Sequence, residues 1–130
     1  YDNTQIMMMD QHNVFPNITV LLHSDLLSVL RTRPGDHPDE CWLDIFNFDR
    51  AGANVARVKP MKMEVPLDSM AFGTVFNQDF NMLRTAQRGL HQPGFTRITL
   101  SQEESRILNN QLALERYIGI SPSEIEGDLP

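Results

Sequence analysis

The 130-residue sequence contains a single cysteine, Cys41, and its longest unbroken apolar run is four residues, at 6–9. One thiol supports neither an intrachain disulfide framework nor a zinc site built from cysteines, so we expect a reducing, cytoplasmic location. A helix that spans a bilayer needs about 20 apolar residues, which argues against insertion into a membrane. The start of the sequence also lacks the pattern of a signal peptide.

The sequence has fewer basic than acidic residues: 11 Lys and Arg residues against 17 Asp and Glu residues, which gives a net charge of −6. The basic residues are scattered, whereas a protein that binds a phosphate backbone concentrates them, so we expect no nucleic-acid partner. Hydrophobic residues make up 41% of the chain, enough for the core of one globular domain. The sequence begins at Tyr1 without an initiator methionine, and we expect it to be a piece of a longer polypeptide.

Alternating apolar residues predict strands in the first half of the chain. Residues 12–22 are interpreted as one strand, placed at an edge or bulged at Pro16 because proline cannot donate to a β-ladder. Residues 26–33 and 41–48 predict two further strands, and the turn-forming residues between them predict an antiparallel meander. Residues 49–66 show neither the alternation typical of a strand nor the spacing typical of a helix, and they predict a loop.

Two helices are predicted in the second half. Thr74 is the expected N-cap of the first, and Gly89 is its expected C′ residue in the left-handed conformation. Ser101 and Glu104 have the spacing of a capping box that begins the second helix, which Gly119 ends. Strands followed by helices predict an α+β fold.

Side chains that carry chemistry are few. No two histidines have the spacing of a metal-binding pair, and we interpret all four as structural or solvent-exposed. They are His12, His23, His37 and His91. Cys41, beside Trp42, is interpreted as a small hydrophobic residue of the core.

Asp79 stands out, because its neighbours three and four residues away on the first predicted helix are apolar. These neighbours are Val75, Phe76, Met82 and Leu83. A carboxylate on an apolar stripe is costly unless it is protonated, paired or bound to a metal. The pattern leaves these alternatives open and favours pairing, for example with Arg84.

The stretch at 77–97 resembles the C-terminal helix of Rieske non-heme iron oxygenase large (alpha) subunits, whose pattern is Q/E-D-x(3)-(L/C)-x(3)-Q-x-G-L. The matching residues are Gln78, Asp79, Leu83, Gln87, Gly89 and Leu90. Phe15-Pro16-Asn17 resembles a strand typical of the same family, and the end of the chain resembles its last helix. The resemblance identifies residues 1–120 as the C-terminal part of the catalytic domain, followed by an acidic tail at 121–130.

The resemblance implies a helix-grip fold, in which an antiparallel sheet packs on long helices around a substrate cavity. It implies a mononuclear Fe(II) held by two histidines and one carboxylate, and it makes Asp79 that carboxylate. The family's two iron histidines lie upstream and have no counterpart in this sequence. Its 2Fe-2S Rieske cluster belongs to an N-terminal domain that is also absent. By position, Met9, Gln11, Leu21 and Val75 are candidates to contact substrate, each with ordinary packing as the alternative.

The function implied for the complete subunit is hydroxylation of an aromatic or similar apolar ring in the catabolism of aromatic compounds. Dioxygen is the oxidant, a ferredoxin or reductase donates electrons, and a dioxygenase is favoured over a monooxygenase. Such subunits form homotrimers, with or without a small beta subunit. These 130 residues alone are not expected to be active. The alternative is a non-catalytic helix-grip module that binds an apolar small molecule, in which Asp79 would be paired within the protein.

Overall fold

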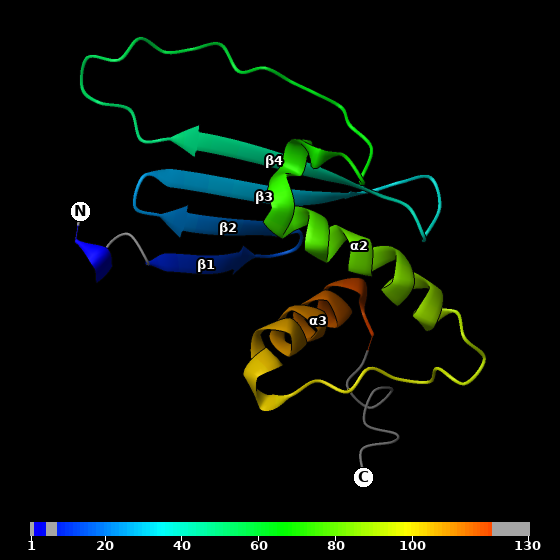
Figure 1. Cartoon of the computed structure of the whole chain (residues 1–130). Coiled ribbons are helices and arrows are strands. Elements are labelled where there is room, and N and C mark those ends of the chain that lie inside the picture. The colour runs from blue at the N-terminus through cyan, green and yellow to red at the C-terminus, as the bar shows by residue number, and fades with distance from the viewer. Residues whose placement is uncertain (1, 5–7, 121–130) are drawn as a thin grey trace. The chain divides into compact units, whose positions relative to one another are not determined.

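A computed structural model describes residues 2–4 and 8–120 of the chain (Figure 1). The strands are β1 (Met9–Val14), β2 (Ile18–His23), β3 (Leu26–Pro34) and β4 (Cys41–Asp49). The chain divides into two units: residues 1–52 with 99–130 form the first, and residues 53–98 form the second. The acidic tail predicted at 121–130 lies outside the described residues.

The first unit contains the predicted antiparallel meander, with the strand order β1-β2-β3-β4. Gln11 is opposite Leu21, Leu21 is opposite Ser28, and Ser28 is opposite Asn47. Because residues directly opposite each other in an antiparallel ladder point to the same side, these four side chains share one face of the sheet. The other face carries the aromatic residues of β4, among them Trp42.

The interpretation of residues 12–22 as one strand is wrong, since the chain reverses direction within them and the sheet has four strands. β1 and β2 pair antiparallel, with Val14 opposite Ile18, and Phe15–Asn17 forms the turn, where the Phe15–Pro16 peptide bond is cis. Pro16 has no N–H to contribute to a ladder, so the strand ends before it. The Asn17 side-chain amide donates to the Thr32 carbonyl oxygen at 2.6 Å, which ties the turn to β3.

The second unit contains η1 (Met70–Phe72) and α2 (Gly73–Leu90). As predicted, a long loop precedes them. Thr74 is not the N-cap, because the Ser69 hydroxyl accepts from the Ala71 N–H and starts the 3-10 turn that continues into the helix. Gly89 is not a left-handed C′ residue either: it lies within α2, which ends at Leu90.

The second predicted helix is confirmed as η2 (Gln102–Glu104) followed by α3 (Ser105–Ile118). The capping box forms, with the Ser101 N–H donating to the Glu104 carboxylate at 2.7 Å. Gly119 ends α3 in the left-handed conformation with φ of 83°. None of the helices among the described residues has both the length and the apolar character needed to cross a membrane.

Few side chains are buried. Among the described residues, the only ones in the buried class are Phe80, at 5% exposure, and Ser28, at 4%. Phe80 packs edge-on against Phe72 and is stacked on Phe76, with ring centroids 5.1 and 5.8 Å apart. Among the described residues, large apolar side chains of β1, β4 and α2 are exposed. Cys41, predicted to be a core residue, is exposed at the start of the edge strand β4.

Candidate iron ligand and ligand-binding cleft

Asp79 is the only carboxylate in α2, and it is exposed. Helix geometry, with about 3.6 residues per turn, places it in the middle of a line of apolar residues that are also exposed. This apolar strip of α2 consists of Val75, Met82, Leu83, Ala86 and Leu90. Val75 is 73% exposed and Met82 is 69% exposed. The helix therefore presents one carboxylate surrounded by hydrophobic side chains.

Among the described residues, Asp79 has neither a hydrogen-bond partner nor an ion-pair partner. Arg84, the partner favoured from the sequence, follows it by five residues and lies on a different side of the helix. The expected pairing is therefore wrong. The alternative of a non-catalytic module, which requires Asp79 to be paired, gains no support from the described contacts.

The described residues do not by themselves form an iron site. Within 2–4 and 8–120, no three His, Cys, Asp or Glu residues lie close enough together to hold a metal ion. A non-heme iron centre of the two-histidine, one-carboxylate type needs three protein ligands. An exposed carboxylate on a helix, without a partner among the described residues, fits the part of one such ligand, and Asp79 has that character.

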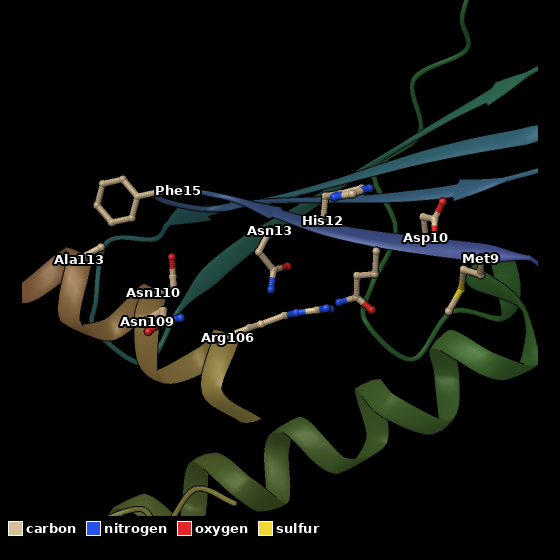
Figure 2. Close-up of a pocket in the computed structure, with 10 residues that line it drawn as sticks. Met9, Asp10, His12, Asn13, Phe15, Arg106, Asn109, Asn110 and Ala113 are labelled. Atoms are coloured by element: carbon tan, nitrogen blue, oxygen red, sulfur yellow. The ribbon is translucent and has the colours of Figure 1, made fainter. Parts of the chain in front are cut away.

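A cleft of about 750 Å³ lies between β1 and α3 in the first unit (Figure 2). It is lined by Met9, Asp10, Gln11, His12, Asn13, Phe15, Arg106, Asn109, Asn110 and Ala113. Two of the four predicted substrate residues, Met9 and Gln11, belong to this lining. Leu21 does not, although it is opposite Gln11 on the same face of the sheet. Val75 belongs to the other unit, on the apolar strip of α2.

Strand alternation decides which β1 side chains enter the cleft. Figure 2 shows Met9 and Asn13 on the side of β1 that faces α3, and Asp10 and His12 on the opposite side. Phe15 lies at the end of β1, and its ring meets Tyr117 of α3 edge-on with centroids 5.9 Å apart.

The contribution of α3 to this cleft was missed by sequence reasoning. Its lining residues are Arg106, Asn109, Asn110 and Ala113. They follow the spacing i, i+3, i+4 and i+7, which places them on one face of a helix. The signal available in the sequence was three polar residues at helical spacing, Arg106, Asn109 and Asn110, beside the apolar positions from which this helix was predicted.

The opposite face of the sheet carries a carboxylate in a very different situation. Asp44 accepts hydrogen bonds from Arg33 Nε and Arg31 Nη2, both at 2.7 Å. The hydrogen bonds from Arg33 first, and from Arg31 second, hold the pKa of the Asp44 carboxyl well below its usual value. The two guanidinium groups also lie over aromatic rings, Arg31 over Phe46 at 5.5 Å and Arg33 over Trp42 at 5.9 Å. Arg33 Nη2 also donates to the other carboxylate oxygen, Oδ1, at 3.0 Å, so both oxygens of Asp44 are engaged and this carboxylate has a structural role.

Comparison with protein families gives a match over almost the whole chain. Residues 2–119 match the model of the ring hydroxylating alpha subunit (catalytic domain) family. The chain belongs to this family. Comparisons with curated proteins and with solved structures give no match.

Membership of the ring-hydroxylating alpha-subunit family confirms the resemblance seen in the sequence. The family is one of non-heme iron oxygenase domains, and the four-stranded antiparallel sheet with two helices agrees with the α+β fold predicted for it. The matched region includes both units, so it contains α2 with Asp79 as well as the cleft between β1 and α3.

Proposed function

We propose that this chain is part of a Rieske-type ring-hydroxylating oxygenase in which Asp79 is the carboxylate ligand of the mononuclear catalytic iron. The observation that carries the proposal is the position of Asp79, exposed and without a described partner in the middle of the apolar strip of α2. The two histidine ligands and the 2Fe-2S cluster are then supplied by residues outside this sequence. Residues 1–120 are the C-terminal part of the catalytic domain, and 121–130 form an acidic tail.

A physical argument supports this role. A carboxylate surrounded by hydrophobic side chains loses hydration when that surface is covered, and the loss is costly unless a cation compensates the negative charge. A divalent metal ion supplies that compensation. When bound, iron supplies the activation of dioxygen. Asp79 is fixed on a helix of 18 residues, which holds its carboxylate in a defined position, and its neighbours Val75 and Leu83 offer apolar contacts to a ring and exclude water.

The proposed substrate is an aromatic or similar apolar ring, and dioxygenation is proposed rather than monooxygenation. Met9, Gln11, Leu21 and Val75 are the proposed substrate contacts; the location of Met9 and Gln11 in a cleft supports the first two. Electrons are proposed to come from a ferredoxin or reductase in the cytoplasm. The proposed assembly is a homotrimer, with or without a small beta subunit.

The experiment that tests the proposal is Asp79→Ala in the complete polypeptide, with mononuclear iron measured by metal analysis and turnover measured on an aromatic substrate. Loss of a metal ligand should lower both by at least about tenfold. Far-UV circular dichroism and the thermal unfolding midpoint of the variant should not change, which separates loss of a ligand from loss of the catalytic domain's fold.

The matched control is Asp68→Ala, which removes another exposed carboxylate of the second unit, outside α2. This variant should keep its iron and its turnover. If Asp79→Ala retained the iron content of the unmodified protein, Asp79 would not be the ligand and the proposal would fail.

A further inference from the structure

The cleft between β1 and α3 contains a positive charge that the described residues do not neutralise. Arg106 lies in the first turn of α3, and it has no ion pair or hydrogen bond among the described residues. Arg106 is exposed and follows the end of η2 by two residues, so its guanidinium is accessible to a ligand in the cleft.

Several residues that line the cleft with Arg106 carry neutral side-chain amides. The Asn13 Oδ1 atom accepts from the Thr19 hydroxyl at 3.0 Å, which leaves the Asn13 NH₂ group to donate into the cleft. Asn109 and Asn110 add two further amides from α3. Asp10 is the only carboxylate in the lining, and its side chain projects from the opposite side of β1 (Figure 2). The interior of the cleft thus combines one guanidinium with neutral amides.

This combination matches a carboxylate better than other anions. A guanidinium binds a carboxylate through two parallel N–H···O hydrogen bonds, a geometry that a planar acid satisfies. One positive charge balances a monoanion, whereas a phosphate dianion would be left undercompensated in a chain of net charge −6. The volume of about 750 Å³ is that of a small-molecule site.

The two ends of the cleft are apolar. Met9 lies at one end of β1 and Phe15 follows the other end (Figure 2). The Phe15 ring contacts Tyr117 edge-on. A ligand that places a charged group beside Arg106 therefore finds hydrophobic contacts for the rest of its body. Small acids with an apolar ring combine a charged group and a hydrophobic body in this way.

We propose that the cleft between β1 and α3 binds a small carboxylic acid that carries an apolar ring, with its carboxylate held by Arg106 and Asn13. The inference rests on the proposed function in one respect only, namely that this acid is the substrate of the oxygenase. It narrows the substrate class from apolar rings in general to ring carboxylates.

The test compares benzoate with benzamide, which has nearly the same shape but no charge, by calorimetric titration of the complete polypeptide. Benzoate should bind, and benzamide should bind at least about tenfold more weakly because it forms no charge-assisted hydrogen bonds. Arg106→Gln should weaken benzoate by a similar factor and leave benzamide unchanged. Absence of benzoate binding, or equal binding of the two probes, would overturn the proposal.

Two further variants control for folding. Asn13→Asp keeps the oxygen that accepts from Thr19 and adds a negative charge, so it should weaken benzoate at least as much as Arg106→Gln does. Arg116→Gln removes another arginine of α3 that is outside the cleft, and it should leave benzoate binding unchanged. Equal loss of binding in Arg116→Gln and Arg106→Gln would assign the effect to the net charge of the helix and overturn the proposal.

The binding assay involves no turnover, so its result can be separated from the assignment of Asp79. Benzoate binding that survives Asp79→Ala but is lost in Arg106→Gln supports the cleft, whatever the iron content of Asp79→Ala. Retained iron in Asp79→Ala counts against the proposed function alone.

Discussion

Asp44 of the first unit and Asp79 of the second unit are carboxylates in opposite situations. In the first unit, the Asp44 carboxylate accepts hydrogen bonds from two arginines, and neighbouring polar side chains pair across strands, as Ser28 does with Asn47 at 2.8 Å. In the second unit, Asp79 has no such partner among the described residues. Full pairing indicates a side chain that stabilises the sheet, whereas an unpaired carboxylate among apolar side chains indicates one that acts on something else.

In the second unit, the two sides of α2 also differ from each other. One side of α2 carries Phe76 and Phe80, which form an aromatic cluster with Phe72, and the adjacent side carries the exposed apolar strip around Asp79. Aromatic contacts of this kind contribute more than their buried area alone. The aromatic cluster therefore stabilises the second unit. The apolar strip of α2 is exposed and can contact a ligand or another part of the protein.

The largest effect is expected from Phe80→Ala. Removing a buried phenylalanine costs about 3–5 kcal/mol, because contacts are lost and a cavity remains. Val75→Ala is the matched control on the exposed strip and should change the free energy of unfolding by no more than about 0.5 kcal/mol. Denaturant unfolding measures both, and hydrogen exchange should locate the loss of protection in α2. Equal effects of the two substitutions would remove the distinction between the two sides of the helix.

A smaller effect, of opposite sign in the two units, is expected when one glycine of each is replaced by alanine. Gly119 ends α3 with φ of 83°, and an added Cβ meets no atom within 4 Å, so Gly119→Ala suffers only the backbone cost of about 1–2 kcal/mol. Gly89 lies inside α2 and also has open space for a Cβ. Gly89→Ala should stabilise the protein by about 0.5–1 kcal/mol. Thermal unfolding measures both changes, and a destabilising Gly89→Ala would mean that α2 ends before this residue.

The smallest effect is expected from Asp44→Asn, and it depends on pH. Because the pKa of Asp44 is lowered in the folded protein, its stabilising contribution is complete above the unfolded pKa of about 4 and is lost as the pH falls towards the folded pKa. The difference in urea midpoint between the unmodified protein and Asp44→Asn should thus be constant near neutral pH and shrink below about pH 4. Asp68→Asn is the control and should leave the midpoint unchanged throughout. A difference that stays constant down to pH 3 would argue against the paired state of Asp44.

Local signals in the sequence predicted several elements correctly. The capping box of Ser101 and Glu104 and the left-handed Gly119 formed as expected, since each depends on residues within one turn. The strands after residue 25 and the meander followed from alternation and short turns. The α+β class followed from the order of the elements and from the family resemblance.

Other features depended on interactions that a linear pattern does not contain. Pro16 predicted an irregular point in the strand, but a proline alone does not say whether the chain bulges or reverses there. The pairing of β1 with β2 shows that the chain reverses. Gly89 looked like a terminator, but the helix continues to Leu90 because nothing there requires the left-handed conformation. Met9 and Gln11, predicted as substrate contacts, line the cleft, and their contact with substrate stays a prediction. The α3 side of the cleft was not predicted, because Arg106 lies about 95 residues further along the chain and is brought near β1 only by folding.

The stacking of Arg33 on Trp42 has a practical consequence for spectroscopy. The 130 residues contain one tryptophan, and its ring is partly exposed on β4, beside the guanidinium that binds Asp44. Its fluorescence is an optical reporter built into one edge of the sheet, sensitive to the state of that ion pair. The second unit contains no tryptophan, so for these residues a change in emission records events in the first unit alone.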